Sequence, residues 1–439
     1  MTARLATNQQ NTIYSDLDVR LACGSSTVKA RMSLFNQISS LGNLDLEAIR
    51  GQDTLLVCPF TLDSMAQVLQ LAYANKWSVV PSGQGSKLGW GRQVNSPQII
   101  LSTKKLNKIL EHAVSELTVT VESGVLLKDL QFELAKFRQF LPIDPAYADL
   151  ATLGGIVSTA DTGSYRQGYG SLRDLVLGLS WLRSDGQLAK AGSKVVKNVA
   201  GYDLMKLLSG SYGTLGVLTS ITFRLYPLPA DSLTLVVTGQ AEPIKQLAQK
   251  IYQSSLTPTM FDLLSKELVT HLGLGEGLVG LILRWQTIPE SIAKQKELVI
   301  AQISDCQFKV YTAQAQEALW QEIKSTIRQG DQQSTICKIG ISSSNSVDFL
   351  NCALSKSALG QIHFASGVGY LKIKQTHLLA ELRSYLESNK GFLTVLEGSR
   401  ESEFEPWGYQ GNALEMMRKI KEQFDPHGIF SPGRFIGNI

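Results

Sequence analysis

The stretch Pro81-Ser-Gly-Gln-Gly-Ser-Lys-Leu-Gly-Trp-Gly91 decides which fold is expected, because it leaves a short apolar run and holds four glycines between Gly83 and Gly91. Successive backbone N–H groups in such a loop can converge into a concave anion site. Missing Cβ atoms let a diphosphate lie against the main chain. Ser82 and Ser86 add hydroxyl donors, and Lys87 adds positive charge. Taken alone, a surface loop between two strands explains the stretch as well as a phosphate site does.

Two familiar phosphate motifs do not account for this loop. It lacks the Gly-x-x-x-x-Gly-Lys-Ser/Thr spacing of a Walker loop, and it is not a Rossmann fingerprint. One Gly-x-Gly-x-x-Gly does occur, at residues 275–280, but an expected helix precedes it and a strand-like run at 281–285 follows it. A dinucleotide fingerprint needs a strand, a turn and then a helix. We therefore interpret residues 275–280 as a turn that enters a strand.

Two further glycine-dense segments favour a ligand crevice over a plain surface loop. In Asp144-Pro-Ala-Tyr-Ala-Asp-Leu-Ala-Thr-Leu-Gly-Gly-Ile-Val-Ser-Thr159, the pair Gly154-Gly155 comes just before the small-residue start of a helix. In residues 197–204 and 210–216 a helix ends at glycine, and a tight loop then feeds a strand at 217–223. Each segment, taken alone, is explained equally well as a turn or helix end that serves only the fold. Three such loops at strand ends are typical of a crevice around an extended ligand.

The apolar patterns predict a chain of mixed helices and strands. In the N-terminal half, strands are expected at 55–59, 78–81, 98–101, 117–121 and 217–226, helices at 61–75 and 126–140, and an Asp-Gly hairpin across 175–191. After Pro229 the pattern changes to that of a separate α+β domain. Its expected elements are strands at 232–238 and 280–285 and helices at 243–254 and 289–304, with a last helix at 413–424.

Composition and charge exclude several functional classes. A chain of 439 residues exceeds one compact core, so at least two domains are expected. A net charge of +4, with Lys and Arg spread along the chain, gives no basic face for nucleic acid. No apolar run approaches the roughly 20 residues that span a bilayer, and the first thirty residues lack the apolar segment of a secretory signal. We expect a cytoplasmic protein, attached to the inner membrane at most through partners.

The five cysteines predict neither a metal site nor an iron–sulfur cluster. They lie at Cys23, Cys58, Cys306, Cys337 and Cys352, and no pair has the Cys-x-x-Cys spacing of a ligand set. We interpret them as reduced thiols that pack as small apolar side chains. If electrons pass on to a cluster, another subunit must hold it.

In this order, the glycine-rich segments resemble the FAD-binding domain of the vanillyl-alcohol oxidase / p-cresol methylhydroxylase (PCMH) family. The resemblance covers about residues 53–229, and Phe424-Asp-Pro-His-Gly-Ile-Phe-Ser-Pro-Gly433 is similar to the family's C-terminal return to the flavin. Within the family, residues 197–204 and 210–221 are most similar to the FAD-binding E subunit of bacterial glycolate oxidase (glycolate dehydrogenase), a relative of D-lactate dehydrogenases.

The resemblance implies an α+β fold with a two-subdomain PCMH-type FAD-binding domain and an α+β cap domain. The implied division is a tail and lead-in at 1–50, the FAD-binding domain at 51–229, the cap at 230–403 and a returning segment at 404–439. The family's cofactor contacts carry over to three groups of residues in this chain. They are Ser82, Gly83, Gln84, Gly85, Ser86, Lys87 and Leu88 at the pyrophosphate, Thr152, Gly154, Gly155, Ser158, Thr159 and Gly163 at the flavin, and Gly213, Gly216 and Val217 on the last strand.

Three departures from the family pattern qualify these implications. Residues 210–213 read Gly-Ser-Tyr-Gly, whereas catalytic D-lactate dehydrogenases usually have Gly-Ser-Glu-Gly. In this respect Tyr212 resembles the E subunit. Many relatives attach FAD through a histidine near the loop, but none lies between residues 60 and 111, so noncovalent FAD is expected. Ser431 stands where the family often has Asn.

Catalytic residues are not evident from the sequence. Oxidation of a 2-hydroxy acid by flavin needs a base for the hydroxyl proton and a cation for the carboxylate. No two of the five histidines have the spacing of a metal-binding pair, so no metal is expected. A surface or capping role is favoured for each histidine. This interpretation is weakest for His427, because its motif is expected to return to the flavin. Arg284 and Arg400 are candidate carboxylate clamps. The other histidines are His112, His271, His363 and His377.

Two hypotheses follow. In the first, the chain oxidises glycolate or a similar small 2-hydroxy acid itself. In the second, it is a flavin-binding relay or scaffold, and another subunit performs the chemistry. The resemblance implies a catalytic FAD subunit and an iron–sulfur subunit as partners. A stand-alone FAD oxidoreductase with another substrate, such as an NADPH-dependent reductase, is a further alternative.

Overall fold

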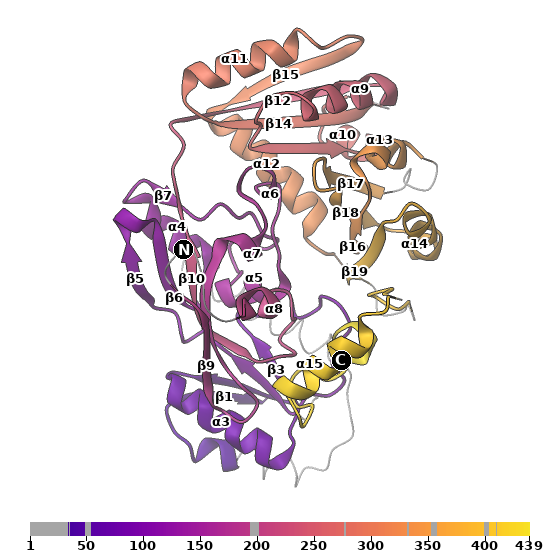
Figure 1. The fold of residues 1–439 in the computed structure, drawn as a ribbon. Coiled ribbons are helices and arrows are strands. Elements are labelled where there is room, and N and C mark those ends of the chain that lie inside the picture. Colours follow the sequence, from indigo (N-terminus) through magenta and orange to yellow (C-terminus); the bar gives the residue numbers. More distant parts are fainter. Residues whose placement is uncertain are drawn as a thin grey trace, which may run out of the picture.

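A computed structural model describes residues 34, 36–48, 54–193, 202–275, 278–331, 333–352, 358–398, 404–409 and 411–439. Most of the predicted tail at 1–50, Cys23, residues 197–201 of the third glycine-dense segment, and the candidate clamp Arg400 lie outside these residues. The described residues form three larger sheets, of four, five and eight strands, which are stacked from bottom to top in Figure 1, and one small two-stranded sheet.

The first sheet has four strands in the order β1 (Leu44–Ala48), β2 (Leu55–Pro59), β4 (Ile99–Ser102) and β3 (Val79–Ser82). The last three run parallel. Helix α3 (Leu62–Asn75) covers this sheet through Met65, Val68 and Leu69, which are fully buried against Val57 and Ile99. Thr61 caps the helix and forms a reciprocal capping box with Ser64. The predicted strand and capped helix are confirmed.

The second sheet is antiparallel, in the order β5 (Ile109–Ala113), β6 (Thr118–Glu122), β10 (Val217–Arg224), β8 (Val176–Leu182) and β9 (Leu188–Gly192). The Asp185-Gly186 hairpin is confirmed, with Gly186 at φ +79°. Helices α4 (Leu127–Ala135) and α5 (Leu153–Thr159) pack on this sheet, and α6 (Arg166–Tyr169), α7 (Leu172–Leu175) and α8 (Leu204–Leu208) are short.

The predicted helix at 126–140 is wrong in its last part. Helix α4 ends at Ala135, Arg138 takes φ +53°, and β7 (Gln139–Phe140) pairs with β11 (Tyr226–Pro227). The Gln139 side chain donates to the Val114 carbonyl at 2.8 Å. This strand pairing and the Gln139 contact hold the segment extended, although its apolar spacing fits a helix.

The third sheet has eight antiparallel strands and fills the upper part of Figure 1. Helices α9 (Ala241–Tyr252), α11 (Pro289–Ile300), α13 (Ser343–Asn351) and α14 (Leu379–Ser388) pack on one face, whereas α12 (Ala313–Arg328) and α10 (Lys266–His271) pack on the other. The order is β15 (Cys306–Thr312), β12 (Asp231–Gly239), β14 (Val279–Thr287), β13 (Met260–Leu264), β17 (Ala358–His363), β18 (Val368–Ile373), β16 (Thr335–Gly340) and β19 (Phe392–Glu397).

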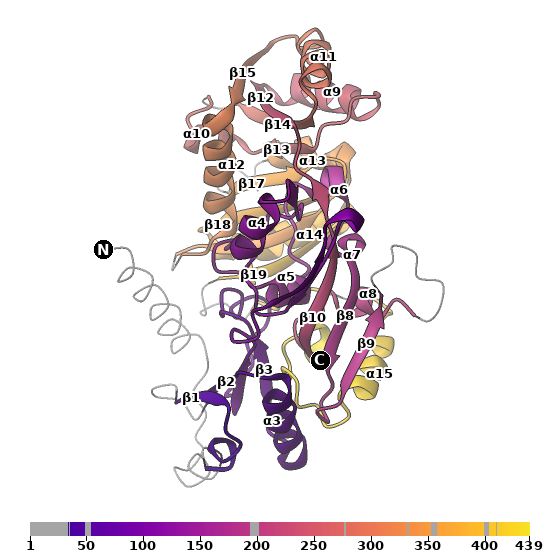
Figure 2. The same cartoon turned by 90° about the vertical axis from the view of Figure 1, so that its left-hand side faces the viewer.

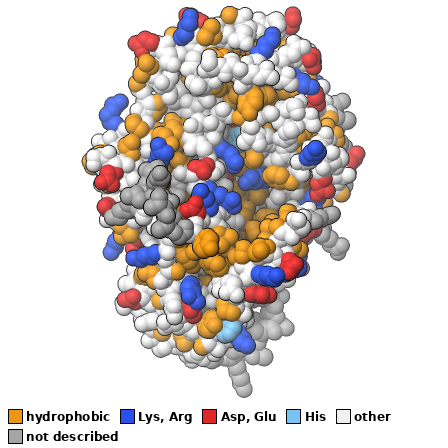
Figure 3. Space-filling model, in the orientation of Figure 1, with side chains coloured by type: hydrophobic (Ala, Val, Ile, Leu, Met, Phe, Trp, Pro, Cys, Tyr) orange, Lys and Arg blue, Asp and Glu red, His pale blue; other side chains and the backbone are white. Residues whose placement is uncertain are grey.

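The α12 face of the eight-stranded sheet looks toward the N-terminal half of the chain. Trp90 and Ala146 from that half share a buried cluster with Met260 on β13 and Tyr370 on β18. Figure 2 shows α12 lying alongside this sheet, above the smaller sheets. The space-filling view in Figure 3 shows Lys and Arg side chains gathered near the middle of the molecule, between its upper and lower parts.

The C-terminal segment returns to the first sheet. Helix α15 (Leu414–Phe424) confirms the predicted last helix. Beyond it, Phe430 forms a parallel bridge with Val79, and Val79 N–H donates to the Ile429 carbonyl at 2.8 Å. The end of the chain therefore lies beside β3, the strand from which the glycine-rich loop leaves (Figure 1).

Candidate functional site

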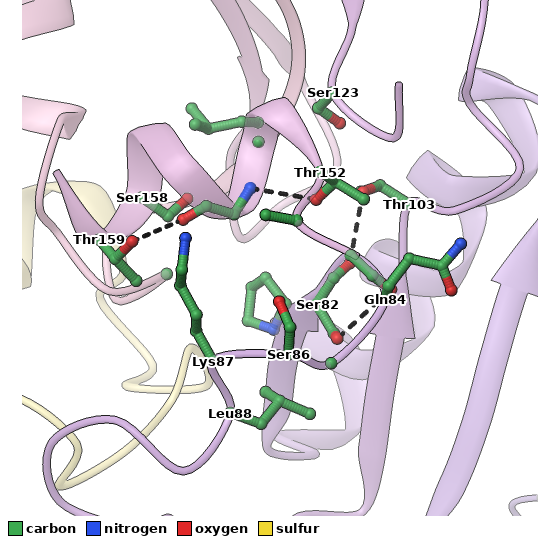
Figure 4. Close-up of a pocket in the computed structure, with 18 of the residues that line it drawn as sticks. Ser82, Gln84, Ser86, Lys87, Leu88, Thr103, Ser123, Thr152, Ser158 and Thr159 are labelled. Atoms are coloured by element: carbon green, nitrogen blue, oxygen red, sulfur yellow. Dashed lines mark hydrogen bonds between the residues drawn. The ribbon is translucent and has the colours of Figure 1, made fainter. Parts of the chain in front are cut away.

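The glycine-rich loop forms one wall of a cavity of about 640 Å³. The start of α5 and the turn before β10 form the opposite wall. Figure 4 shows the side chains of Ser82, Gln84 and Ser86 on one side and those of Thr152, Ser158 and Thr159 on the other.

Glycines let the two walls approach each other. A Cβ on Gly83 would lie 2.0 Å from Thr152 Oγ1, and a Cβ on Gly154 would lie 2.8 Å from Ser123 Cβ. Gly85 and Gly213 take φ values of +86° and +72°, which favour glycine. The backbone of both walls is therefore exposed to a ligand at positions where a side chain would clash or strain the main chain.

Most of the cofactor residues predicted from the sequence come together here. Gly163 and Gly216 do not line the cavity: a Cβ on Gly163 would meet the Asp144 carboxylate, and one on Gly216 would meet Trp181. The predicted residues that do line it are Ser82, Gly83, Gln84, Gly85, Ser86, Lys87, Leu88, Thr152, Gly154, Gly155, Ser158, Thr159, Gly213 and Val217.

Two buried polar atoms of the cavity have neither a hydrogen bond nor an ion pair among the described residues. Ser123 Oγ has no hydrogen bond, and Arg434 Nε has none either. The other end of the Arg434 guanidinium donates only to backbone carbonyls, those of Lys87, Leu88 and Trp90. Burial lowers the pKa of Arg434 to about 10. A buried cation without a carboxylate partner is stabilised by an anion, so the cavity suits a phosphate-bearing ligand.

Sequence reasoning missed Arg434 as a site residue. It directly follows Gly433, at the end of the motif that was expected to return to the flavin. Its position beside that motif was a usable signal, because arginine is the residue best suited to phosphate.

Lys87 belongs to a buried ion network that joins the cavity to the eight-stranded sheet. Its Nζ lies 2.8 Å from Asp161 Oδ2, and Arg328 from α12 pairs with the other oxygen of the same carboxylate. Burial alone would raise the pKa of Asp161, but Arg328 and Lys87 outweigh it and hold the pKa below its ordinary value. Burial lowers the pKa of Lys87, and Asp161 offsets only part of that effect. Neither Asp161 nor Arg328 was singled out from the sequence.

A second buried pair lies on the face of the eight-stranded sheet that looks toward the N-terminal half. His363 Nδ1 lies 2.7 Å from Asp262 Oδ1, and both side chains are buried. Asp262 Oδ2 accepts hydrogen bonds from Ser164 Oγ and Gln361 Nε2. His363 Nε2 is buried without a partner in the part of the chain that the structure describes. The predicted surface or capping role is wrong for His363.

His427 does not reach the cavity. Its side chain is exposed, stacks on Tyr73 at 4.0 Å and shares a hydrogen bond with the Tyr73 carbonyl. The expectation that it stands out among the histidines is not supported by its position. Across the described residues, no group of three or more His, Cys, Asp or Glu side chains is arranged to hold a metal ion.

Comparison with protein families identifies the cofactor of this chain. Residues 54–192 match the FAD binding domain, and residues 398–435 match the C-terminal domain of FAD linked oxidases. The first match contains the glycine-rich loop and α5, and the second contains Arg434. The chain carries an FAD-binding domain, FAD is its cofactor, and it is an FAD-dependent oxidoreductase.

Two curated relatives carry glycolate oxidase names. The chain is 24% identical to glycolate oxidase subunit GlcD of Bacillus subtilis over 418 residues, which cover 86% of this chain and 88% of the relative. It is 37% identical to glycolate oxidase subunit GlcE of Escherichia coli over 179 residues, which cover 40% of this chain and 50% of that relative. The alignment with the second therefore spans only half of that protein.

A solved structure confirms the predicted fold class. The structure of p-cresol methylhydroxylase with bound substrate superposes with a TM-score of 0.74 at 15% identity, over 94% of this chain and 98% of that one. At this identity the likeness establishes the fold alone. Within the described ranges, no helix is long and apolar enough to cross a bilayer.

Proposed function

We propose that this chain is the FAD-binding component of an enzyme that oxidises glycolate or a similar small 2-hydroxy acid. The observation that carries the proposal is the cavity between the glycine-rich loop and α5. Its buried Arg434 cation and Ser123 hydroxyl suit an anionic, polar ligand. The glycolate oxidase names of two relatives supply the substrate class.

In this proposal FAD binds noncovalently, and it supplies the acceptor for the hydride that leaves the substrate carbon. The backbone of residues 82–88 and Arg434 hold the diphosphate. Thr152, Ser158 and Thr159 line the remainder of the cofactor. His112 is the histidine nearest in sequence to the glycine-rich loop. It pairs with Gln139 and does not line the cavity, which supports noncovalent binding of FAD.

Asp262 and His363 are the candidates for taking the hydroxyl proton of the substrate. Asp262 orients the imidazole through Nδ1, which leaves Nε2 as the nitrogen that can accept a proton. An oriented histidine with a free nitrogen is the usual form of a general base. This pair favours a chain that performs the oxidation itself.

The alternative is a flavin-binding relay or scaffold subunit. Tyr212 in the turn before β10 and the identity to a GlcE subunit favour it. We also propose a catalytic FAD subunit and an iron–sulfur subunit of a glycolate oxidase complex as partners, and attachment to the inner membrane through them. Assignment of this chain to the E type rests on the higher identity over the shorter alignment.

The test is to purify the full chain alone, load it with FAD and follow the flavin absorbance without oxygen. Rapid bleaching by glycolate or D-lactate supports oxidation by this chain. Bleaching only after a partner FAD subunit is added supports the relay. Bleaching by NADPH and by no hydroxy acid contradicts the proposal and indicates a reductase.

A further inference from the structure

Two charged side chains line the FAD cavity, and both are cations. They are Lys87 and Arg434, and no carboxylate of a described residue lines this cavity. The Lys87 side chain is 5% exposed, and its Nζ forms an ion pair with Asp161 but no hydrogen bond with any other described residue. An ammonium carries more N–H donors than one ion pair uses. Lys87 therefore has donors left for the ligand of the cavity.

The Lys87 side chain lies away from the part of the loop that suits a diphosphate. In Figure 4 it extends from the loop toward Ser158 and Thr159 of α5, whereas Gln84 lies away from them. The Lys87 ammonium is 2.8 Å from the Asp161 carboxylate, and a carboxylate at this position repels a diphosphate.

A buried cation that is already paired in this way suits a part of the ligand that is neutral at first and gains negative charge in the reaction. The isoalloxazine ring of FAD is such a part. It takes up two electrons and one proton when it is reduced, and this leaves one negative charge on the ring. The position of Lys87 therefore fits the flavin end of FAD.

Asp161 fixes the position of the Lys87 ammonium, because both of its carboxylate oxygens are engaged. Oδ2 accepts the Ala146 N–H at 2.9 Å and also pairs with Lys87, whereas Oδ1 pairs with Arg328. The side chains of Asp161 and Arg328 are almost fully buried. Since Arg328 takes a share of the negative charge of this carboxylate, Lys87 remains an incompletely compensated cation.

Arg328 is held between the eight-stranded sheet and the N-terminal half. Its Cζ lies 4.4 Å from the centre of the Tyr370 ring, and Tyr370 Oη donates to the Thr162 carbonyl at 3.1 Å. Arg328 Nη1 donates to the main-chain carbonyl of Asp144 at 2.7 Å. The Asp144 carboxylate accepts two backbone N–H groups and does not line the FAD cavity. Arg328 does not line that cavity either, so it acts there only through Asp161.

We propose that the Lys87 ammonium raises the reduction potential of bound FAD by stabilising the negative charge of the reduced flavin. In this proposal Arg328 is a positioning residue, which keeps Lys87 in this role through Asp161. A fixed charge near the flavin ring is one of the means by which a protein tunes this cofactor. The proposal rests on FAD as the cofactor and not on the proposed substrate.

The experiment measures the reduction potential of FAD in the full-length, FAD-loaded protein by anaerobic titration with dithionite in the presence of a reference dye. Lys87→Gln should reduce the equilibrium constant for two-electron reduction roughly tenfold, which lowers the potential by about 30 mV. Asp161 keeps its pair with Arg328 in this variant, so the fold is expected to remain intact. Lys87→Arg keeps the charge and should retain most of the wild-type potential.

Arg328→Gln tests the positioning role. It leaves the Asp161 carboxylate with Lys87 as its remaining ion-pair partner, so the charge of Lys87 is compensated more fully and the potential should fall. Arg328→Lys keeps the charge and should restore the potential. Lys136→Gln is the matched control, because Lys136 is exposed, pairs with Glu133 and does not line the FAD cavity. Circular dichroism and flavin absorbance check the folding and FAD content of each variant.

A potential equal to wild type in Lys87→Gln overturns the proposal, and weaker FAD binding in the same variant would then assign Lys87 to the diphosphate. A potential lowered in Lys87→Gln but unchanged in Arg328→Gln overturns the positioning role of Arg328. Dithionite reduces the flavin without any substrate. If no hydroxy acid reduces the flavin while its potential still depends on Lys87, the proposed function fails and the role of Lys87 stands.

Discussion

At the scale of single residues, Arg434 is the residue on which we propose that FAD binding depends most directly. Arg434→Gln removes the buried cation that lines the cavity and leaves a shorter, uncharged polar side chain. A charge-assisted hydrogen bond contributes roughly 1.5–3 kcal/mol, so the dissociation constant of FAD should rise tenfold or more. Fluorescence titration of the apoprotein with FAD measures this. Arg418→Gln, an exposed change on α15, is the control and should leave the affinity unchanged.

Asp161 gives the protein a defined response to acid. Its pKa lies below the ordinary 3.8, so its contribution to stability is complete above about pH 4 and is lost as the pH falls through the folded-state pKa. Asp161→Asn should abolish this part of the acid sensitivity. It should also lower the free energy of unfolding at pH 7 by roughly 3 kcal/mol or more, because Lys87 and Arg328 remain buried without a carboxylate.

Urea unfolding of wild type and Asp161→Asn at pH 3.5, 5 and 7 measures this prediction. Asp129→Asn is the control, because Asp129 is exposed on α4 and pairs with neither Lys87 nor Arg328. Equal stability of Asp161→Asn and wild type at pH 7 would show that the ion network contributes nothing.

The sequence predicts those site residues that are contiguous in the chain, and it misses those that are far apart. The loop residues at 82–88 were predicted because their glycines and hydroxyls are contiguous. The Asp262–His363 pair was not, because its members are separated by 101 residues and only the pairing of β13 with β17 brings them together. The Lys87–Asp161–Arg328 network joins three such distant segments.

At the scale of elements, the start of α3 offers a clean test of local sequence signals. Thr61 Oγ1 accepts the Ser64 N–H, and Ser64 Oγ accepts the Thr61 N–H. Thr61→Ala removes the cap, so the free energy of unfolding should fall by about 1 kcal/mol. Urea unfolding measures the change. Thr270→Ala, at an exposed position of α10, should have a much smaller effect.

The same elements show where local signals fail. The helix at 62–75 was predicted closely because its cap and apolar spacing are both local. The segment at 136–140 has the same apolar spacing. Its last two residues nevertheless form a strand, because Gln139 pairs with Pro227 of β11, which lies far along the chain. Tertiary pairing thus overrides helical periodicity where the helix is already ending.

At the scale of the whole molecule, the two halves of the chain are joined by polar contacts around the FAD cavity. Arg328 of α12 donates to the Asp144 carbonyl at 2.7 Å and pairs with Asp161. Tyr147 Oη donates to Glu397 Oε2 at 2.8 Å, which ties the loop before α5 to β19. The FAD cavity draws its lining from the loop after β3, α5, the turn before β10 and the C-terminal segment, so bound FAD should stabilise the assembled chain rather than one sheet.

This arrangement leads to the last prediction, which concerns removal of FAD. Noncovalent FAD should be released by trichloroacetic acid into the supernatant, and the precipitated protein should be colourless. For the native protein, a ligand at about 100 times its Kd adds roughly 2.7 kcal/mol to the free energy of unfolding. Addition of FAD to the apoprotein should therefore raise the melting temperature in a dose-dependent way, and Arg434→Gln should shift that dose response to higher FAD concentration. Yellow colour that stays with the acid precipitate would instead show a covalent bond to FAD, and an unchanged dose response in Arg434→Gln would place the diphosphate away from this guanidinium.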